Sequence, residues 1–253
     1  MKSRKTFSRL FVALLACAAL LAVAQKQGAA AAAAAGMAPD RGRFAIQLGG
    51  QTIGHEEFEI SPMGGGWKAK GTTSLKAGEG AETKISGDLV IQQDGSPVSY
   101  DWTAQTDKTN GAHISFSNGV ASITLQMQGA HLCTPDEIKD PNRKTSCFFQ
   151  QDLSFDNPRI AVLDNNLYHQ YAVLARLYDW SKRGAQTFPV LIPQELTPGT
   201  ITTEATGSAS SGGKTYEGLK INTTDVEILL LLDSSHRLMR LEVPTANVAV
   251  IRE

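Results

Sequence analysis

Residues 164–193 read DNNLYHQYAVLARLYDWSKRGAQTFPVLIP, and this stretch decides the fold. Its apolar residues recur at helical spacing, at Leu167, Tyr171, Leu174 and Tyr178. They predict one amphipathic helix of about four turns, with short polar residues at 164–166 to cap its start and a cationic, glycine-containing end at 182–184. The apolar run 187–193, which contains a proline and ends at one, then indicates a strand. We expect the helix to cover one end of a curved β-sheet, with partner binding as the alternative.

The residues on both sides of this stretch predict strands and turns. Phe44, Ile46 and Leu48 alternate with polar or small residues, and the following Gly49-Gly50 is typical of a hairpin turn. Further turn sequences lie at 61–66, 77–80, 94–95, 107–111, 117–119, 207–213 and 233–235. Strands of about 8 to 12 residues between such turns indicate a mainly β fold, a curved antiparallel sheet or half-open barrel with one covering α-helix.

The N-terminus predicts export. Basic residues at 2–9 precede an apolar core at 10–23, and Ala22-Val23-Ala24 is a small-x-small cleavage signal, so residues 1–24 indicate a secretory signal peptide. The apolar run is too short for a comfortable membrane span, and we expect no transmembrane anchor. Leu14-Leu15-Ala16-Cys17 offers an alternative, a lipobox that would leave a lipid anchor at Cys17. The predicted location is the periplasm or the extracellular space, with attachment to the outer membrane open.

Composition limits the partners of the mature chain. Residues 25–39 are mostly alanine and predict a tether, which leaves residues 40–253 as a single β-rich domain. Without the four basic leader residues, 20 lysines and arginines stand against 25 acidic residues, a net charge near −5. This balance, without a compact basic patch, disfavours nucleic acid and anionic membrane surfaces as partners.

The mature chain has two cysteines, Cys133 and Cys147, in a polar loop at 129–150. In an exported chain this pair predicts a disulfide. The alternative is a metal site built from His131, both cysteines and a carboxylate. Because the spacing matches no established zinc pattern, we expect no metal and no cofactor.

Catalytic signatures are missing from the sequence. It contains no Gly-x-Ser-x-Gly, His-Glu-x-x-His, Walker or Cys-x-x-Cys motif, and we assign no catalytic residue. His55, Glu57 and Glu59 share one strand face and could chelate a metal, but a solvated polar face opposite Phe58 and Ile60 is the better explanation. His113, His169 and His236 lie in separate predicted elements.

Several short motifs resemble a known group of proteins. They are Tyr171, Leu174 and Arg176 on the helix, residues 184–190 (GAQTFPV), the late Asp233, Leu238, Arg240 and Glu242-Val243-Pro244, and residues 49–56 (GGQTIGHE). They resemble exported bacterial β-rich proteins classified as domains of unknown function, and the resemblance extends over about half of the mature chain. The resemblance implies a curved antiparallel sheet, distantly similar to the half-barrels of lipoprotein-localisation factors, and no established activity. The loop at 129–150 is not part of the pattern.

Binding is the function that this composition favours. Trp67, Tyr100, Trp102 and Phe116 could line the concave face of a curved sheet. We therefore expect a non-enzymatic envelope protein that holds an apolar or lipid-like ligand there. In the alternative, these aromatics fill a dry core and the protein is structural or an adaptor that works through protein–protein contacts; hydrolysis by an unrecognised dyad is a third hypothesis. An apolar void of roughly several hundred Å³ would favour the carrier, and a filled interior would oppose it.

Overall fold

The computed structural model describes residues 36–76, 82–139, 147–148 and 150–253. Residues Met37–Glu253 form one compact unit. The predicted signal peptide, Cys17, most of the predicted tether and the predicted turn at 77–80 lie outside the described residues.

The first half of the unit is an antiparallel meander, as its turn sequences predicted. Each strand pairs with the next one along the chain. Gly49 and Gly50 both have positive φ at the first hairpin, where a side chain would strain the backbone. The strands are β1 (Asp40–Leu48), β2 (Gln51–Met63), β3 (Gly66–Leu75), β4 (Thr83–Gln92), β5 (Pro97–Gln105), β6 (Thr109–Ser117) and β7 (Val120–Met127).

The middle of the chain leaves the meander and then enters the core. Two two-residue strands pair in parallel as a small separate sheet, and a one-turn helix lies between them in the sequence. The chain returns to the main sheet beside β7 before it reaches the long helix. The elements are β8 (His131–Leu132), α2 (Pro135–Lys139), β9 (Cys147–Phe148), β10 (Gln150–Ser154), β11 (Ala161–Val162) and α3 (His169–Leu177).

The last part returns to antiparallel strands joined by tight turns. Two of these turns are short 3-10 helices that begin with proline. The elements are β12 (Gln186–Ile192), η2 (Pro193–Glu195), β13 (Thr197–Ser211), β14 (Lys214–Asn222), β15 (Glu227–Leu232), β16 (Leu238–Val243), η3 (Pro244–Ala246) and β17 (Val248–Arg252).

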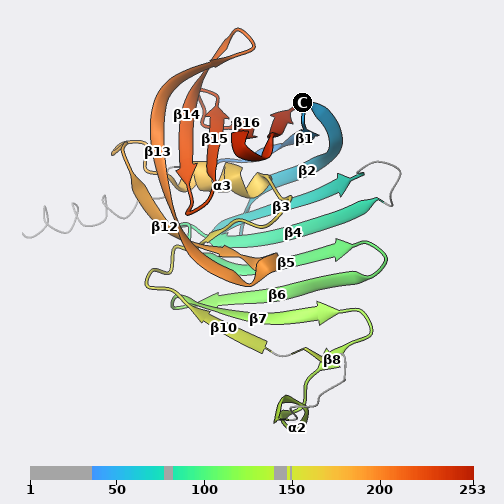
Figure 1. Ribbon diagram of the computed structural model, residues 1–253. Coiled ribbons are helices and arrows are strands. Elements are labelled where there is room, and N and C mark those ends of the chain that lie inside the picture. The colour runs from blue at the N-terminus through green and yellow to red at the C-terminus, as the bar shows by residue number, and fades with distance from the viewer. Residues whose placement is uncertain (1–35, 77–81, 140–146, 149) are drawn as a thin grey trace, which may run out of the picture. The chain divides into compact units, whose positions relative to one another are not determined.

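The halves combine into one open sheet of 15 strands, ordered β10-β7-β6-β5-β4-β3-β2-β1-β17-β16-β15-β14-β13-β12-β11. The first and last strands, β1 and β17, pair antiparallel and join the halves, whereas the edge strand β11 pairs in parallel with β12. The sheet curves around α3, which packs against β3 and β16 (Figure 1). The predicted fold, a curved antiparallel sheet that is not closed, with one covering helix, is confirmed.

Alternation along the strands separates a core face from an outer face. In β5, Tyr100 and Trp102 are buried, whereas Asp101 and Thr103 between and beyond them are exposed. The core continues through Phe44, Phe58 and the apolar side of α3. Burial of these side chains supplies the main stabilisation of the fold, at roughly 25 cal/mol per Å² of apolar surface removed from water.

The helix is shorter than the sequence predicted. α3 begins at His169, because Asn166 has a φ of 61° and interrupts any helix that starts at Asp164. It ends at Leu177, because Tyr178 is extended. The positive φ expected at Gly184 is present, but it belongs to the loop before β12 and not to the helix end.

The predicted serine-rich turn at 207–213 is mostly strand. β13 continues to Ser211, with Ala209 opposite Tyr216 of β14, and the chain reverses only at Gly212 and Gly213. Gly207, with a φ of 84°, lies at a register shift within the strand. The glycine therefore marks a bulge where the sequence suggested a turn.

Candidate functional site

The four aromatics predicted to bind a ligand all lie in or against the hydrophobic core. Tyr100 and Trp102 are buried, and Trp67 and Phe116 are partly buried and packed against the same cluster. The enclosed space beneath α3 measures about 10 Å³, little more than one water molecule needs. This pocket is therefore too small for a ligand, and the ligand-binding role of the four aromatic side chains stays a prediction.

A buried carboxylate on β2 fixes the start of α3. Glu56 Oε2 accepts hydrogen bonds from the backbone N–H groups of Tyr168 and His169, at 2.9 and 3.1 Å, and Oε1 lies 2.6 Å from His169 Nδ1. The side chains of Glu56 and His169 are both fully buried. Because the first N–H groups of a helix lack partners within it, this carboxylate from another element acts as the cap.

Two glycines make room for that contact. Gly71 of β3 and Gly87 of β4 are directly opposite in register. A Cβ at position 71 would lie 2.2 Å from His169 Nδ1, and one at position 87 would lie 2.7 Å from Leu167 Cδ1. The paired glycines thus form a shallow trough in the sheet into which residues 167–169 fit.

A second buried carboxylate holds the segment before the helix. Asp164 accepts hydrogen bonds from the Tyr100 hydroxyl at 2.8 Å and from the backbone N–H groups of Gln194 and Asn165, at 2.9 and 3.1 Å. Burial raises the pKa of Asp164, although the hydrogen bonds from Gln194 and Tyr100 oppose that shift. Burial and the nearby Asp164 carboxylate also raise the pKa of Tyr100. Asp164 and Tyr100 are thus held in place by hydrogen bonds and lie inside the core.

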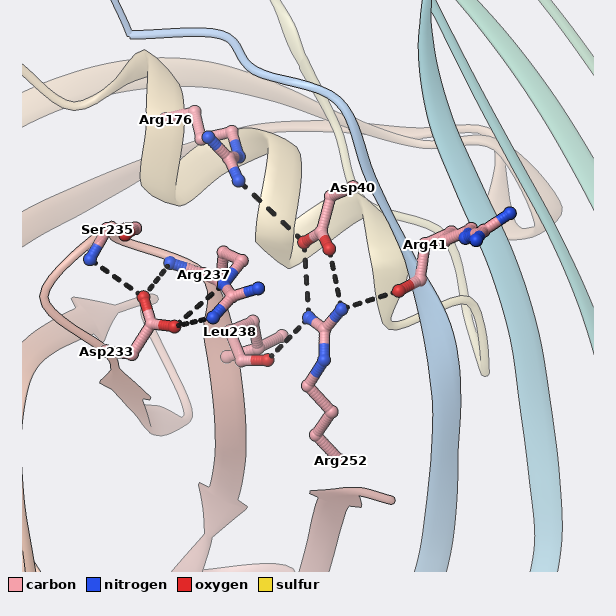
Figure 2. Close-up of polar contacts among 8 residues, drawn as sticks. All are labelled: Asp40, Arg41, Arg176, Asp233, Ser235, Arg237, Leu238 and Arg252. Carbon is pink, nitrogen blue, oxygen red and sulfur yellow. Dashed lines mark hydrogen bonds and ion pairs between the residues drawn. The ribbon is translucent and has the colours of Figure 1, made fainter.

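A third carboxylate lies where the first strand, β1, pairs with the last strand, β17. Asp40 Oδ1 and Oδ2 accept hydrogen bonds from Arg252 Nη2 and Nη1, at 2.6 and 3.2 Å. Figure 2 shows Asp40 between Arg252 of β17 and Arg176 of α3, whose Nη2 lies 3.8 Å from Oδ2. Burial lowers the pKa of Arg176, and the charge of Asp40 opposes that shift. A bidentate pair of this kind joins the first strand to the last one.

Arg252 is held by more than its carboxylate. It also donates to the carbonyl oxygens of Arg41 and Leu238, at 2.7 and 3.2 Å. The guanidinium carbon lies 5.2 Å from the ring centroid of Phe58 and 6.0 Å from that of Phe44. These two rings stack on each other at 4.7 Å. The arginine therefore combines ionic, hydrogen-bond and cation–π contacts at one point.

A cleft of about 510 Å³ opens beside this cluster. It is lined by Pro39, Asp40, Arg41, Glu59, Ile60, Ser61 and Arg237. The side chain of Arg237 is oriented by Asp233, which it contacts through Nε and Nη2, both at 2.7 Å (Figure 2). Asp233 raises the pKa of Arg237, so this side chain stays cationic. The cleft thus combines a preorganised cation with exposed Arg41 and Glu59 side chains, and is the candidate functional site.

Other predicted polar residues lie outside this cleft. His55 and Glu57 are on the outer face of β2, as expected for a solvated strand face, with His55 Nδ1 3.6 Å from Glu253. His113 contacts Asp101 at 2.7 Å on the outer face. Cys133 and Cys147 form the predicted disulfide, with their Cα atoms 5.0 Å apart.

Sequence reasoning missed the buried charges. Asp40 and Arg252 are 212 positions apart and carried no motif. For Glu56 the sequence did contain a signal. It is a charged residue on the strand face that otherwise carries the apolar side chains of Phe58 and Ile60. A charge at a core position of a strand indicates a buried partner, but its partner lies 113 residues away on another element.

Fold and site together define an open, β-barrel-like domain with an internal helix. No family model matches the chain, and no curated protein matches it. Among solved structures it is similar to a β-barrel-like protein of the domain of unknown function DUF1849 from Brucella abortus, with 10% identity, a TM-score of 0.51, and coverage of 85% of this chain and 94% of that chain. A DUF1089 family protein from Pseudomonas aeruginosa matches with 7% identity, a TM-score of 0.47, and coverage of 78% and 91%. The first likeness confirms the expected resemblance to β-rich domains of unknown function, for the fold alone.

Among the described residues, the helices are all too short or too polar to cross a membrane.

Proposed function

We propose that this is a non-enzymatic, exported protein of the cell envelope that acts as an adaptor, through protein contacts at the cleft beside Asp40. The proposal rests on a comparison of two volumes, that of the pocket beneath α3 and that of the cleft beside Asp40. The space beneath α3 is about 10 Å³, whereas the cleft on the surface is about 510 Å³ and carries charged side chains. A lipid chain needs an enclosed apolar site of roughly several hundred Å³, so the surface is the better-supported place of binding.

The chemistry of the cleft favours a polar partner. Arg41 is exposed, Arg237 is half exposed and held in position by Asp233, and Glu59 lies across from Arg41 in the β1–β2 register. Arginine is enriched where proteins meet, because its planar guanidinium binds carboxylates in a fixed geometry. The buried pair of Asp40 and Arg252 gives these side chains a rigid base.

Site-specific photo-crosslinking in the cell envelope tests the proposal. A photoreactive residue at position 41 should give a defined protein adduct, which Arg237→Glu should weaken because it reverses the preorganised charge. The same residue at Lys84, an exposed outer-face position on β4, is the matched control and should give no such adduct. Equal labelling at both positions would contradict the proposal.

Native mass spectrometry of protein purified from its own envelope tests the competing carrier hypothesis. A clean apo mass is expected. A stoichiometric lipid-like species released on denaturation would support the carrier hypothesis instead, with a ligand bound by the aromatic residues Trp67, Tyr100, Trp102 and Phe116.

A further inference from the structure

The loop between β7 and β10 brings three potential metal-binding side chains together. The ligand atoms of His131, Glu137 and Cys147 all lie within 4.8 Å of one another. Cys133 is not one of these three residues, but its sulfur is bonded to that of Cys147. One sulfur, one imidazole and one carboxylate are therefore clustered, with a second sulfur bonded to the first, at residues that the cleft beside Asp40 does not use.

The spacing of these atoms approaches that of a tetrahedral site. Zinc bonds of about 2.0 Å to nitrogen and oxygen and 2.3 Å to sulfur place ligand atoms about 3.3–3.8 Å apart. His131 Nε2 lies 2.9 Å from Glu137 Oε1. The four ligand atoms must move to reach this spacing, in a loop whose His131 side chain is 56% exposed.

The carboxylate is already oriented by a neighbour. Glu137 Oε2 accepts hydrogen bonds from the backbone N–H and the hydroxyl of Thr134, both at 2.8 Å. Metal-binding carboxylates are held by such outer hydrogen bonds, which fix the direction of the ligand oxygen. Thr134 thus fills the supporting role, while His131 Nε2 lies 2.9 Å from Oε1 and 3.1 Å from Oε2.

The oxidation state of the sulfurs decides whether the site binds. Thiolates bind zinc, and a disulfide offers no thiolate. We propose that reduction of the Cys133–Cys147 disulfide converts this loop into a zinc site with His131 and Glu137 as the other two ligands. A dithiol reductant supplies two electrons and two protons and becomes a disulfide, which gives two thiols. Zn²⁺ then displaces both thiol protons and is bound by two thiolates, the His131 Nε2 lone pair and the Glu137 carboxylate.

This inference is independent of the proposed adaptor function. Figure 1 shows β8 and α2 beyond β7 and β10, at the edge of the sheet remote from β1. The small β8–β9 sheet is separate from the 15-stranded sheet. The state of the cysteines should therefore leave the cleft beside Asp40 unchanged.

Co²⁺ is the probe for the test, because it occupies zinc sites and shows thiolate charge-transfer absorption. The mature protein, reduced with a phosphine under anaerobic conditions, should bind one Co²⁺ with these bands, and Zn²⁺ should displace it. The oxidised protein should show none. Thr134→Ala should weaken binding by about 10- to 100-fold through loss of the supporting hydrogen bond. His113→Ala is the matched control, since it removes an exposed histidine that pairs with Asp101 on another element.

Three variants separate this site from a simple pair of thiols. His131→Ala and Glu137→Gln should each weaken binding and alter the absorption, whereas Cys133→Ser/Cys147→Ser should abolish it with an unchanged circular dichroism spectrum of the sheet. The proposal is overturned if the reduced protein binds Co²⁺ no more tightly than the double serine variant. It is equally overturned if His131→Ala and Glu137→Gln both bind as the wild type does.

Discussion

Position 71 has space for a hydrogen atom and for nothing larger. An alanine Cβ there would lie 2.2 Å from His169 Nδ1 and 2.6 Å from Glu56 Oε1, inside a fully buried pair of hydrogen-bonded side chains. We expect Gly71→Ala to lower the free energy of unfolding by about 1–3 kcal/mol, as overpacked core substitutions do. Denaturant-induced unfolding measures this.

Gly199→Ala is the control for that substitution. Gly199 also lies in a strand, β13, but its Cβ would meet Val190 Cγ1 at 3.4 Å, an ordinary contact. Its stability should stay within about 0.5 kcal/mol of the wild type. Equal stabilities for the two variants would mean that the trough at Gly71 is not tightly filled.

The carboxyl of Glu137 should titrate far below its usual range. The backbone N–H and hydroxyl of Thr134, together with His131, lower the pKa of Glu137 from 4.5 to about 2. Since the folded pKa lies below the unfolded value, this carboxylate stabilises the folded loop above about pH 4.5, and the stabilisation is lost as the pH falls towards 2. In Thr134→Ala the backbone donor remains, so the pKa should rise part of the way to 4.5. Side-chain NMR titration would show it, and an unchanged midpoint would contradict it.

At the scale of elements, α3 is fixed to the sheet by a buried acidic residue near each end. Glu56 contacts His169 at the start, and Asp40 contacts Arg176 near the end. Glu56→Gln replaces one of the two acceptor oxygens by an NH₂ group and leaves a buried donor without a partner, so it should lower the free energy of unfolding by about 1–3 kcal/mol. A double-mutant cycle with His169→Gln should give a coupling energy of about 0.5–3 kcal/mol.

The outer face offers a matched pair for this cycle. His113 and Asp101 are joined by a similar contact, 2.7 Å long, but their side chains are 46% and 56% exposed. Asp101→Asn should therefore cost less than about 1 kcal/mol. If the two pairs cost the same, burial of Glu56 and His169 contributes nothing special to the attachment of α3.

Elements were predictable where the signal is local. Gly49-Gly50 predicted a turn and the alternation of Phe44, Ile46 and Leu48 predicted a strand, because both signals depend on neighbouring residues. The helix limits were wrong, because Asp164 is engaged by Tyr100 and Gln194 instead of capping the helix. Its true cap comes from Glu56, on a strand more than a hundred residues earlier.

At the scale of the whole molecule, the candidate site could not be predicted from the sequence either, because it depends on contacts between distant residues. Arg41, Arg237 and Asp40 come together only because β1 pairs with β17 and thus closes the gap between the chain's two halves. Strand order of this kind does not follow from periodicity, since every strand of a meander has the same alternation. The fold class could be predicted from the sequence, whereas the cleft required the pairing.

The disulfide gives a test of how the whole molecule unfolds. If the loop at 133–147 were part of the cooperative core, closing it would stabilise the protein by about 3 kcal/mol in the chain-entropy model. The cysteines lie beside a small sheet separate from the main one, and Leu132 and Ile138 near them are exposed. In the variant without the disulfide, we expect the loop to open while the 15-stranded sheet stays folded. The disulfide of the wild type therefore restricts the loop in the folded state about as much as in the unfolded state, and its net effect on global stability is small. Cys133→Ser/Cys147→Ser should therefore lower the global free energy of unfolding by less than about 1 kcal/mol, while amide exchange in β8 and α2 becomes much faster. A global loss near the full 3 kcal/mol would show instead that this loop and the sheet unfold as one unit.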